Sequence, residues 1–142
     1  MIRNLAHTAL SVSDMDRSLK FYRDILGMKV VMDMTATDDK IGRIIGIKDS
    51  TCRIIHLYLN DGMLELFQYY TPKRKKTLSD HRQCDIGFTH IGFDVSDIEN
   101  LVVKLKSHNI KILGELVEFR PGVKVVYFSG PDGEICEFRE LP

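Results

Sequence analysis

The same pattern of apolar and polar residues occurs twice along this chain of 142 residues: a short alternating segment followed by a stretch of helical period. The segments from His7 to Asp14 and from His90 to Asp97 align without gaps, and an amphipathic stretch of helical period follows each. Gly27 and Asn109 stand where these helices should end, because both residue types tolerate the left-handed backbone of a helix C-terminus. The pattern therefore predicts an internal repeat that begins, in both copies, with a strand and a helix.

Three further strand-like segments follow each predicted helix. They are Met28–Met34, Arg53–Leu59 and Met63–Tyr69 in the first half, and Lys111–Phe119, Lys124–Ser129 and Glu134–Arg139 in the second. The turn sequences Asn60-Asp61-Gly62 and Pro131-Asp132-Gly133 precede the last strand of each half, as a hairpin requires. Each half is thus a βαβββ module, which predicts an α+β fold with a curved mixed sheet.

The length of the chain fits one compact domain and is too short for two independent ones. We expect a single domain over residues 1–142, with module 1 at about 1–70, a linker at 71–87 and module 2 at about 88–142. The linker holds the basic run Pro72-Lys73-Arg74-Lys75-Lys76, for which a solvated loop is the simpler interpretation and a phosphate-binding patch the alternative. The stretch 35–50, rich in Asp and Gly, is expected to form a loop or a short helix.

Capping signals precede both predicted helices. Ser96 and Glu99 have the spacing of a capping box, and Ser13 with Asp16 is an Asp-containing relative of it. We therefore expect Ser13 and Ser96 to cap the two helices.

Charge and cysteine content narrow the class of protein. Twenty basic residues balance 20 acidic ones, which argues against nucleic acid or a membrane surface as partner and favours a small-molecule ligand. We find neither a signal-peptide pattern nor an apolar run of membrane-spanning length, so we expect a cytoplasmic protein. Cys52, Cys84 and Cys136 are odd in number and lack a CxxC pattern, which favours reduced thiols over disulfides or a structural zinc site.

Strand alternation places two polar side chains of each module, four in all, on the face opposite the apolar one. Leu64 and Leu66 suit the face covered by the helix, so Glu65 between them points to the other face. The same sorting places His7, His90 and Glu137 on the uncovered face, with one His in the first strand and one Glu in the last strand of each module. Phe67 and Tyr127 share that uncovered face and are candidate walls of a ligand pocket, with a purely structural role as the alternative.

A carboxylate within an apolar strand has to be protonated, paired or bound to a metal, because burying its charge alone costs several kcal/mol. Two imidazoles and two carboxylates at repeat-related positions suit one divalent ion, which would be Ni, Co, Zn, Mn or Fe, in a metal-binding cleft. A hydrogen-bonded core His and a solvated Glu are the simpler alternatives, but the repetition favours the metal site. The remaining histidines lack repeat counterparts and are interpreted as structural or surface residues: His56, His81 and His108.

The chain resembles the vicinal oxygen chelate superfamily, which includes glyoxalase I, methylmalonyl-CoA epimerase, extradiol dioxygenases, fosfomycin-resistance enzymes and bleomycin-binding proteins. The segments that carry the resemblance are Ala6–Val31, Met63–Tyr69, Thr89–Ile98 and Val126–Phe138. In this family the metal ligands come from the first and last strand of each module, which implies the same four residues as the strand sorting. Family members of this length commonly form homodimers.

The resemblance implies a metal-dependent, glyoxalase-like lyase or isomerase that transfers a proton on a small substrate with vicinal oxygens. Glu137 would be the base, with Glu65 as a second carboxylate. An iron-dependent extradiol-type dioxygenase using His7, His90 and Glu137 is one alternative, and a non-catalytic small-molecule binding protein is another.

Two positions bear on the substrate. Ser11 and Tyr69 stand where glyoxalase I carries an Arg and an Asn that hold glutathione, which argues against a glutathione adduct. The run from Lys73 to Lys76 would suit the phosphates of a coenzyme A thioester.

Overall fold

The computed structural model describes residues 1, 3–37, 39–73 and 82–142, and the chain divides into two compact units. Unit 1 is Met1–Lys76 and unit 2 is Thr77–Pro142. Of the linker expected at 71–87, residues 74–81 lie outside the described part. No helix in the described residues is long and apolar enough to cross a membrane.

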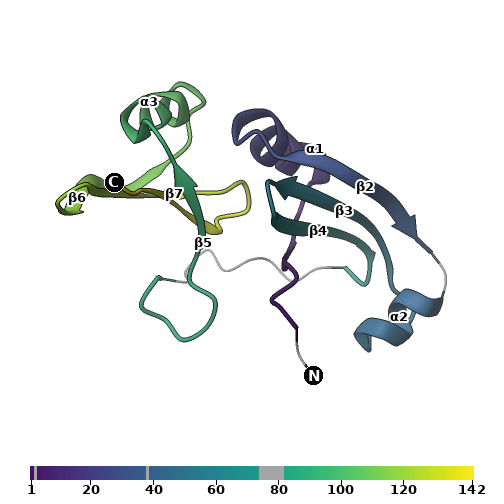
Figure 1. Ribbon diagram of the computed structural model, residues 1–142. Coiled ribbons are helices and arrows are strands. Elements are labelled where there is room, and N and C mark those ends of the chain that lie inside the picture. The colour runs from purple at the N-terminus through teal and green to yellow at the C-terminus, as the bar shows by residue number, and fades with distance from the viewer. Residues whose placement is uncertain (2, 38, 74–81) are drawn as a thin grey trace. The chain divides into compact units, whose positions relative to one another are not determined.

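Unit 1 is a four-stranded mixed sheet, and its helices follow the first and second strands along the chain (Figure 1). The strand order is β1-β4-β3-β2, with β1 parallel to β4 and the other pairs antiparallel. The helix after β1 continues as a π-helix, η1, and the chain leaves it through Gly27 at φ 81°. The elements are β1 (Thr8–Ser11), α1 (Met15–Leu19), η1 (Lys20–Ile25), β2 (Lys29–Ala36), α2 (Asp39–Ile45), β3 (Thr51–Leu59) and β4 (Gly62–Thr71).

Unit 2 repeats this arrangement with the strand order β5-β8-β7-β6, in which β5 is parallel to β8. The predicted α+β fold of two βαβββ modules is therefore confirmed, and the strands of the described residues form two four-stranded sheets. The elements are β5 (Ile91–Val95), α3 (Ile98–Ser107), β6 (Ile112–Arg120), β7 (Val123–Ser129) and β8 (Ile135–Glu140). Here β6 and β7 are joined by a tight turn, whereas α2 separates the equivalent strands of unit 1 (Figure 1).

The last strand of each unit alternates between a buried apolar face and a polar one. Leu64 and Leu66 of β4 are 3% and 0% exposed, and Cys136 and Phe138 of β8 are 0% and 4% exposed. Burial of an aliphatic or aromatic side chain of this size contributes roughly 1.5–3 kcal/mol. Because side chains alternate along a strand, the residues between these pairs point to the opposite face of each sheet.

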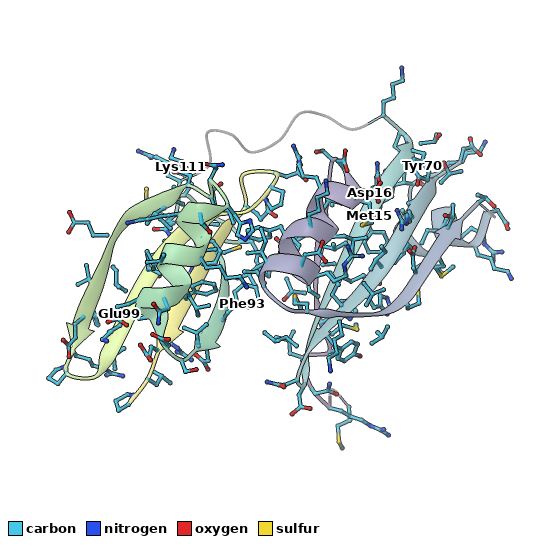
Figure 2. The ribbon with its side chains drawn as sticks, turned by 90° about the horizontal axis from the view of Figure 1, so that it is seen from above. Met15, Asp16, Tyr70, Phe93, Glu99 and Lys111 are labelled. Atoms are coloured by element: carbon cyan, nitrogen blue, oxygen red, sulfur yellow. The ribbon has the colours of Figure 1, made fainter. Side chains whose placement is uncertain are left out.

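The cap of α1 is Asp14, whose side chain accepts a hydrogen bond of 2.9 Å from the backbone N–H of Arg17. The prediction that Ser13 caps this helix is wrong, because its hydroxyl instead accepts a hydrogen bond from the Arg17 guanidinium. A second anchor comes from β4, where the side-chain oxygen of Gln68 accepts from the N–H of Met15 at 3.1 Å. Met15 lies at the start of α1 in Figure 2.

The start of α3 is held in an equivalent way from β8. Asp97 is the N-cap but adopts a left-handed backbone with φ 60° and makes no side-chain capping bond, so the prediction for Ser96 is also wrong. The carboxylate of Glu140 accepts from the N–H groups of Asp97 at 2.7 Å and Ile98 at 3.3 Å. Gln68 lies three positions after Glu65, and Glu140 three positions after Glu137, so each predicted ligand strand also anchors its unit's helix.

Candidate metal site

The first candidate pair lies within unit 1. His7 immediately precedes β1, and Glu65 lies in β4 at the position that pairs with Ala9. His7 Nε2 and Glu65 Oε2 are 3.5 Å apart, with side-chain exposures of 41% and 14%. The parallel pairing of β1 with β4 thus brings together two residues that are distant in the sequence.

The second pair has the same construction within unit 2. His90 immediately precedes β5, and Glu137 of β8 pairs with Gly92. His90 Nε2 and Glu137 Oε2 are 3.4 Å apart. A Cβ on Gly92 would lie 3.1 Å from that carboxylate oxygen, so glycine leaves room for it. The repeat seen in the sequence therefore extends to individual atoms and their separation.

Both separations fit two ligands of a common ion better than a direct hydrogen bond. N–H···O bonds are typically 2.7–3.2 Å long, whereas two ligands at about 2.1 Å from one tetrahedral ion are about 3.4 Å apart. Imidazole nitrogen and carboxylate oxygen are both donors that first-row divalent ions accept. Within the described residues no three His, Cys, Asp or Glu side chains form a metal-binding group, so each unit by itself contributes a pair.

Thr89 makes a hydrogen bond that orients the His90 ring. Its hydroxyl lies 2.9 Å from Nδ1 of His90, on the opposite side of the ring from Nε2. In the tautomer that carries its proton on Nδ1, His90 donates to Thr89 and its Nε2 lone pair is available to a metal. Metal-binding histidines typically have such a partner on their second nitrogen.

Glu65 has a second neighbour that the sequence reasoning missed. His56 of β3 pairs with Glu65 across the hairpin, and its Nε2 lies 2.8 Å from Glu65 Oε1. His56 was interpreted as a structural or surface residue because it has no histidine counterpart in the repeat. The hairpin register could have revealed this contact, because Leu59 and Gly62 pair at the turn. His56 lies three positions before Leu59 and Glu65 three positions after Gly62, so they also pair.

In unit 2 the position across from the glutamate is occupied by Tyr127, which pairs with Glu137. Burial raises the pKa of the Tyr127 phenol, and the charge of Glu137 and a hydrogen bond to it raise that pKa further. The ring also packs edge-on against His90, with centroids 5.3 Å apart. Tyr127 therefore contacts both members of the second pair.

Phe67 shares the face of Glu65, two residues further along β4. Its ring stacks on Tyr69 with centroids 5.8 Å apart, and both rings pack against a buried cluster that includes Ile41 of α2. Burial raises the pKa of the Tyr69 phenol. The other buried members of this cluster are Ala36, Cys52 and Ile54. One end of the Glu65 face is thus covered by α2.

Comparison with known proteins identifies the family. The sequence profile of the Glyoxalase/Bleomycin resistance protein/Dioxygenase superfamily matches residues 4–138, nearly the whole chain. The chain belongs to this superfamily. The resemblance inferred from the sequence segments is therefore confirmed.

The chain is similar in sequence to a protein named as a lyase, and similar in fold to several solved structures. The chain is 30% identical over 132 residues to a Probable lactoylglutathione lyase of Synechocystis sp., covering 91% of this chain and 88% of that protein. A glyoxalase family protein of Bacillus cereus superposes with a TM-score of 0.93 at 19% identity, covering 100% and 97% of the two chains. The fosfomycin resistance protein FosX of Listeria monocytogenes, crystallised with Mn(II), superposes with a TM-score of 0.68 at 14% identity over 97% and 90%.

Proposed function

We propose that this protein is a divalent-metal-dependent lyase or isomerase that transfers a proton on a small substrate with two neighbouring oxygens. In this proposal the ion is held by His7, Glu65, His90 and Glu137. The observation that supports it is the repeated His–Glu pair, in which the same two atoms lie 3.5 Å apart in unit 1 and 3.4 Å apart in unit 2. Two unrelated core contacts would have no reason to share this geometry.

The chemistry of the donors agrees with the metal in one structure of similar fold. Two nitrogens and two carboxylate oxygens suit Ni, Co, Zn, Mn or Fe, and the FosX structure contains Mn(II). A bound divalent ion would polarise a substrate oxygen and so make the proton on the adjacent carbon easier to remove. Because both glutamates are about 15% exposed or less, their charges would be only weakly screened by water.

Glu137 is the proposed base, and its carboxylate would accept the substrate proton and return it. Glu65 is the second catalytic carboxylate and mainly adjusts the charge at the ion. Phe67 and Tyr127 are the proposed substrate-contacting walls, since each lies on the same face as its unit's glutamate. Ser11 and Tyr69 favour a substrate other than a glutathione adduct. A cytoplasmic homodimer without nucleic-acid or membrane partners completes the proposal.

Metal analysis of four purified proteins tests the ligand set. We expect about one ion per chain in the wild-type protein, and loss of the metal in both His7→Ala and His90→Ala, because each removes a nitrogen ligand. His108→Ala, at the exposed end of α3, is the matched control and should retain the wild-type content. Equal metal content in all four proteins would refute the site.

The same preparation separates the alternative functions. Iron together with oxygen consumption on a catechol would indicate an extradiol-type dioxygenase, in which Glu65→Gln leaves the rate unchanged. Bound small molecules without turnover, in a protein whose metal is structural or absent, would indicate a binding protein.

A further inference from the structure

The two carboxylate oxygens of Glu65 have different neighbours. Oε1 lies 2.8 Å from Nε2 of His56, and Oε2 lies 3.5 Å from Nε2 of His7. The first separation is that of a good hydrogen bond, whereas the second is too long for one. Because the Glu65 side chain is only 14% exposed, water competes little with either neighbour. One oxygen is therefore already occupied by the protein, and the other is available.

This arrangement restricts a side chain that would otherwise rotate. The last torsion of a glutamate is broad, so an isolated carboxylate presents either oxygen over a wide range of angles. His56 is fixed by the β3–β4 ladder, where it pairs directly with Glu65, and its own side chain is 27% exposed. In the tautomer that carries a proton on Nε2, its N–H donates to Oε1 and holds the carboxylate plane.

The equivalent position in unit 2 also carries a donor. Tyr127 pairs with Glu137, so its phenol, which can donate a hydrogen bond, lies on the same face as that carboxylate. On β3 the two preceding residues of the same face, Cys52 and Ile54, belong instead to the apolar cluster under α2. A donor thus stands across from each glutamate although the residue type differs between the units.

We infer that His56 is a positioning residue of the metal site: its Nε2–H holds Oε1 of Glu65, so that Oε2 faces the ion together with Nε2 of His7. The inference rests on the proposed function, in which Glu65 is a ligand. His56 acts through Glu65 and does not itself coordinate. Partners of this kind typically change metal affinity by about 10- to 100-fold when they are removed.

Two substitutions separate the hydrogen bond from the space that the ring fills. His56→Leu replaces the imidazole by an apolar side chain of moderate size and so removes the donor, whereas His56→Gln places an amide N–H near the original Nε2. The affinity for Co²⁺ is measured by competition with a chelator, and the visible absorption of bound Co²⁺ reports the ligand geometry. His108→Leu is the control for the same change away from Glu65, and the unfolding midpoint of each metal-free protein monitors the fold.

We expect His56→Leu to bind Co²⁺ about 10- to 100-fold more weakly with an altered spectrum, and His56→Gln to recover affinity to within a few-fold. Unchanged affinity and spectrum in His56→Leu would overturn the inference. Equal losses in both variants would also overturn it, since they would assign the imidazole itself as a ligand. If His56→Leu does not fold, His56→Asn, whose amide lies too far from Oε1, takes its place. A wild-type protein that binds no Co²⁺ would refute the proposed function itself.

Discussion

The two units have the same strand arrangement and differ in what covers the sheet face that carries Glu65 in unit 1 and Glu137 in unit 2. Both place a histidine before the first strand, a glutamate in the last strand, and a side chain three residues further on that anchors the helix. In unit 1, α2 covers the far end of the face and buries Ile41 and Ile54. In unit 2 a tight turn replaces α2, and Val117, on the face of Glu137, is 49% exposed.

The shared features are those the proposed chemistry needs from both halves, namely a nitrogen, a carboxylate and a donor behind the carboxylate. The differing features determine how much of each sheet face is open to a ligand. We therefore expect substitutions at shared positions to act on metal and catalysis, and substitutions at differing positions to act mainly on stability and ligand choice.

The largest predicted difference between the units is the loss of turnover when the glutamate of each is replaced by glutamine. Glu137→Gln should retain most of the metal affinity and lower turnover by about 10²- to 10⁴-fold, because an amide oxygen still coordinates but cannot accept a proton. Glu65→Gln should be milder, at roughly tenfold. Rates would be measured with methylglyoxal hemithioacetals of several thiols and with other substrates that carry adjacent oxygens. Equal losses for both variants would remove the assignment of Glu137 as the base.

An intermediate effect is expected from α2, which occurs only in unit 1 among the described residues. Ile41→Ala removes a side chain that is 9% exposed, and should lower the free energy of unfolding by about 2 kcal/mol through lost burial and the remaining cavity. Ile44→Ala changes a residue that is 79% exposed on the same helix and serves as the matched control. Denaturant titration measures both, and a similar loss for the two variants would contradict a role for α2 in covering this face.

The smallest effects test whether the helix anchors are equivalent. Gln68→Ala removes the acceptor for Met15 N–H, and Glu140→Ala removes the acceptor for Asp97 and Ile98, so each should cost about 1 kcal/mol. Glu115→Ala, an exposed position on β6, should be nearly neutral. Thermal unfolding compares the three. A loss in only one of the two anchor variants would show that the units do not use these contacts equally.

Much of the fold was predictable because the repeat and the strand alternation are local patterns. His7 and His90 align within the repeated segment, and Glu65 and Glu137 each lie between residues that the structure buries. The helix caps were not predictable in this way. Local spacing favoured Ser13 and Ser96, whereas α1 is capped by Asp14, one residue after Ser13. Both helix starts are also anchored from strands far along the chain, and the carboxylate of Glu140 accepts from two N–H groups at the start of α3.

The surroundings of the glutamates were harder to infer than the glutamates themselves. His56 pairs with Glu65, but the residue that pairs with Glu137 is a tyrosine, so His56 has no histidine counterpart in the repeat and residue type alone does not point to it. The packing of Phe67 under α2 was not predictable either, since the stretch 35–50 shows no clear helical period and its helix spans only Asp39–Ile45. Both features depend on which segments pair across the sheet.

The parallel pairing of the first and last strand in each unit has a consequence for the order of folding. Ala9 pairs with Glu65 across 56 positions of the sequence (65 − 9), and Gly92 pairs with Glu137 across 45 (137 − 92). Contacts of such long sequence separation carry a large loop-closure entropy and tend to form slowly. The histidine and glutamate of a pair are therefore far apart in the unfolded chain. A divalent ion bound by these pairs would favour the folded state by mass action, and metal uptake after dilution from denaturant would report the completion of each sheet.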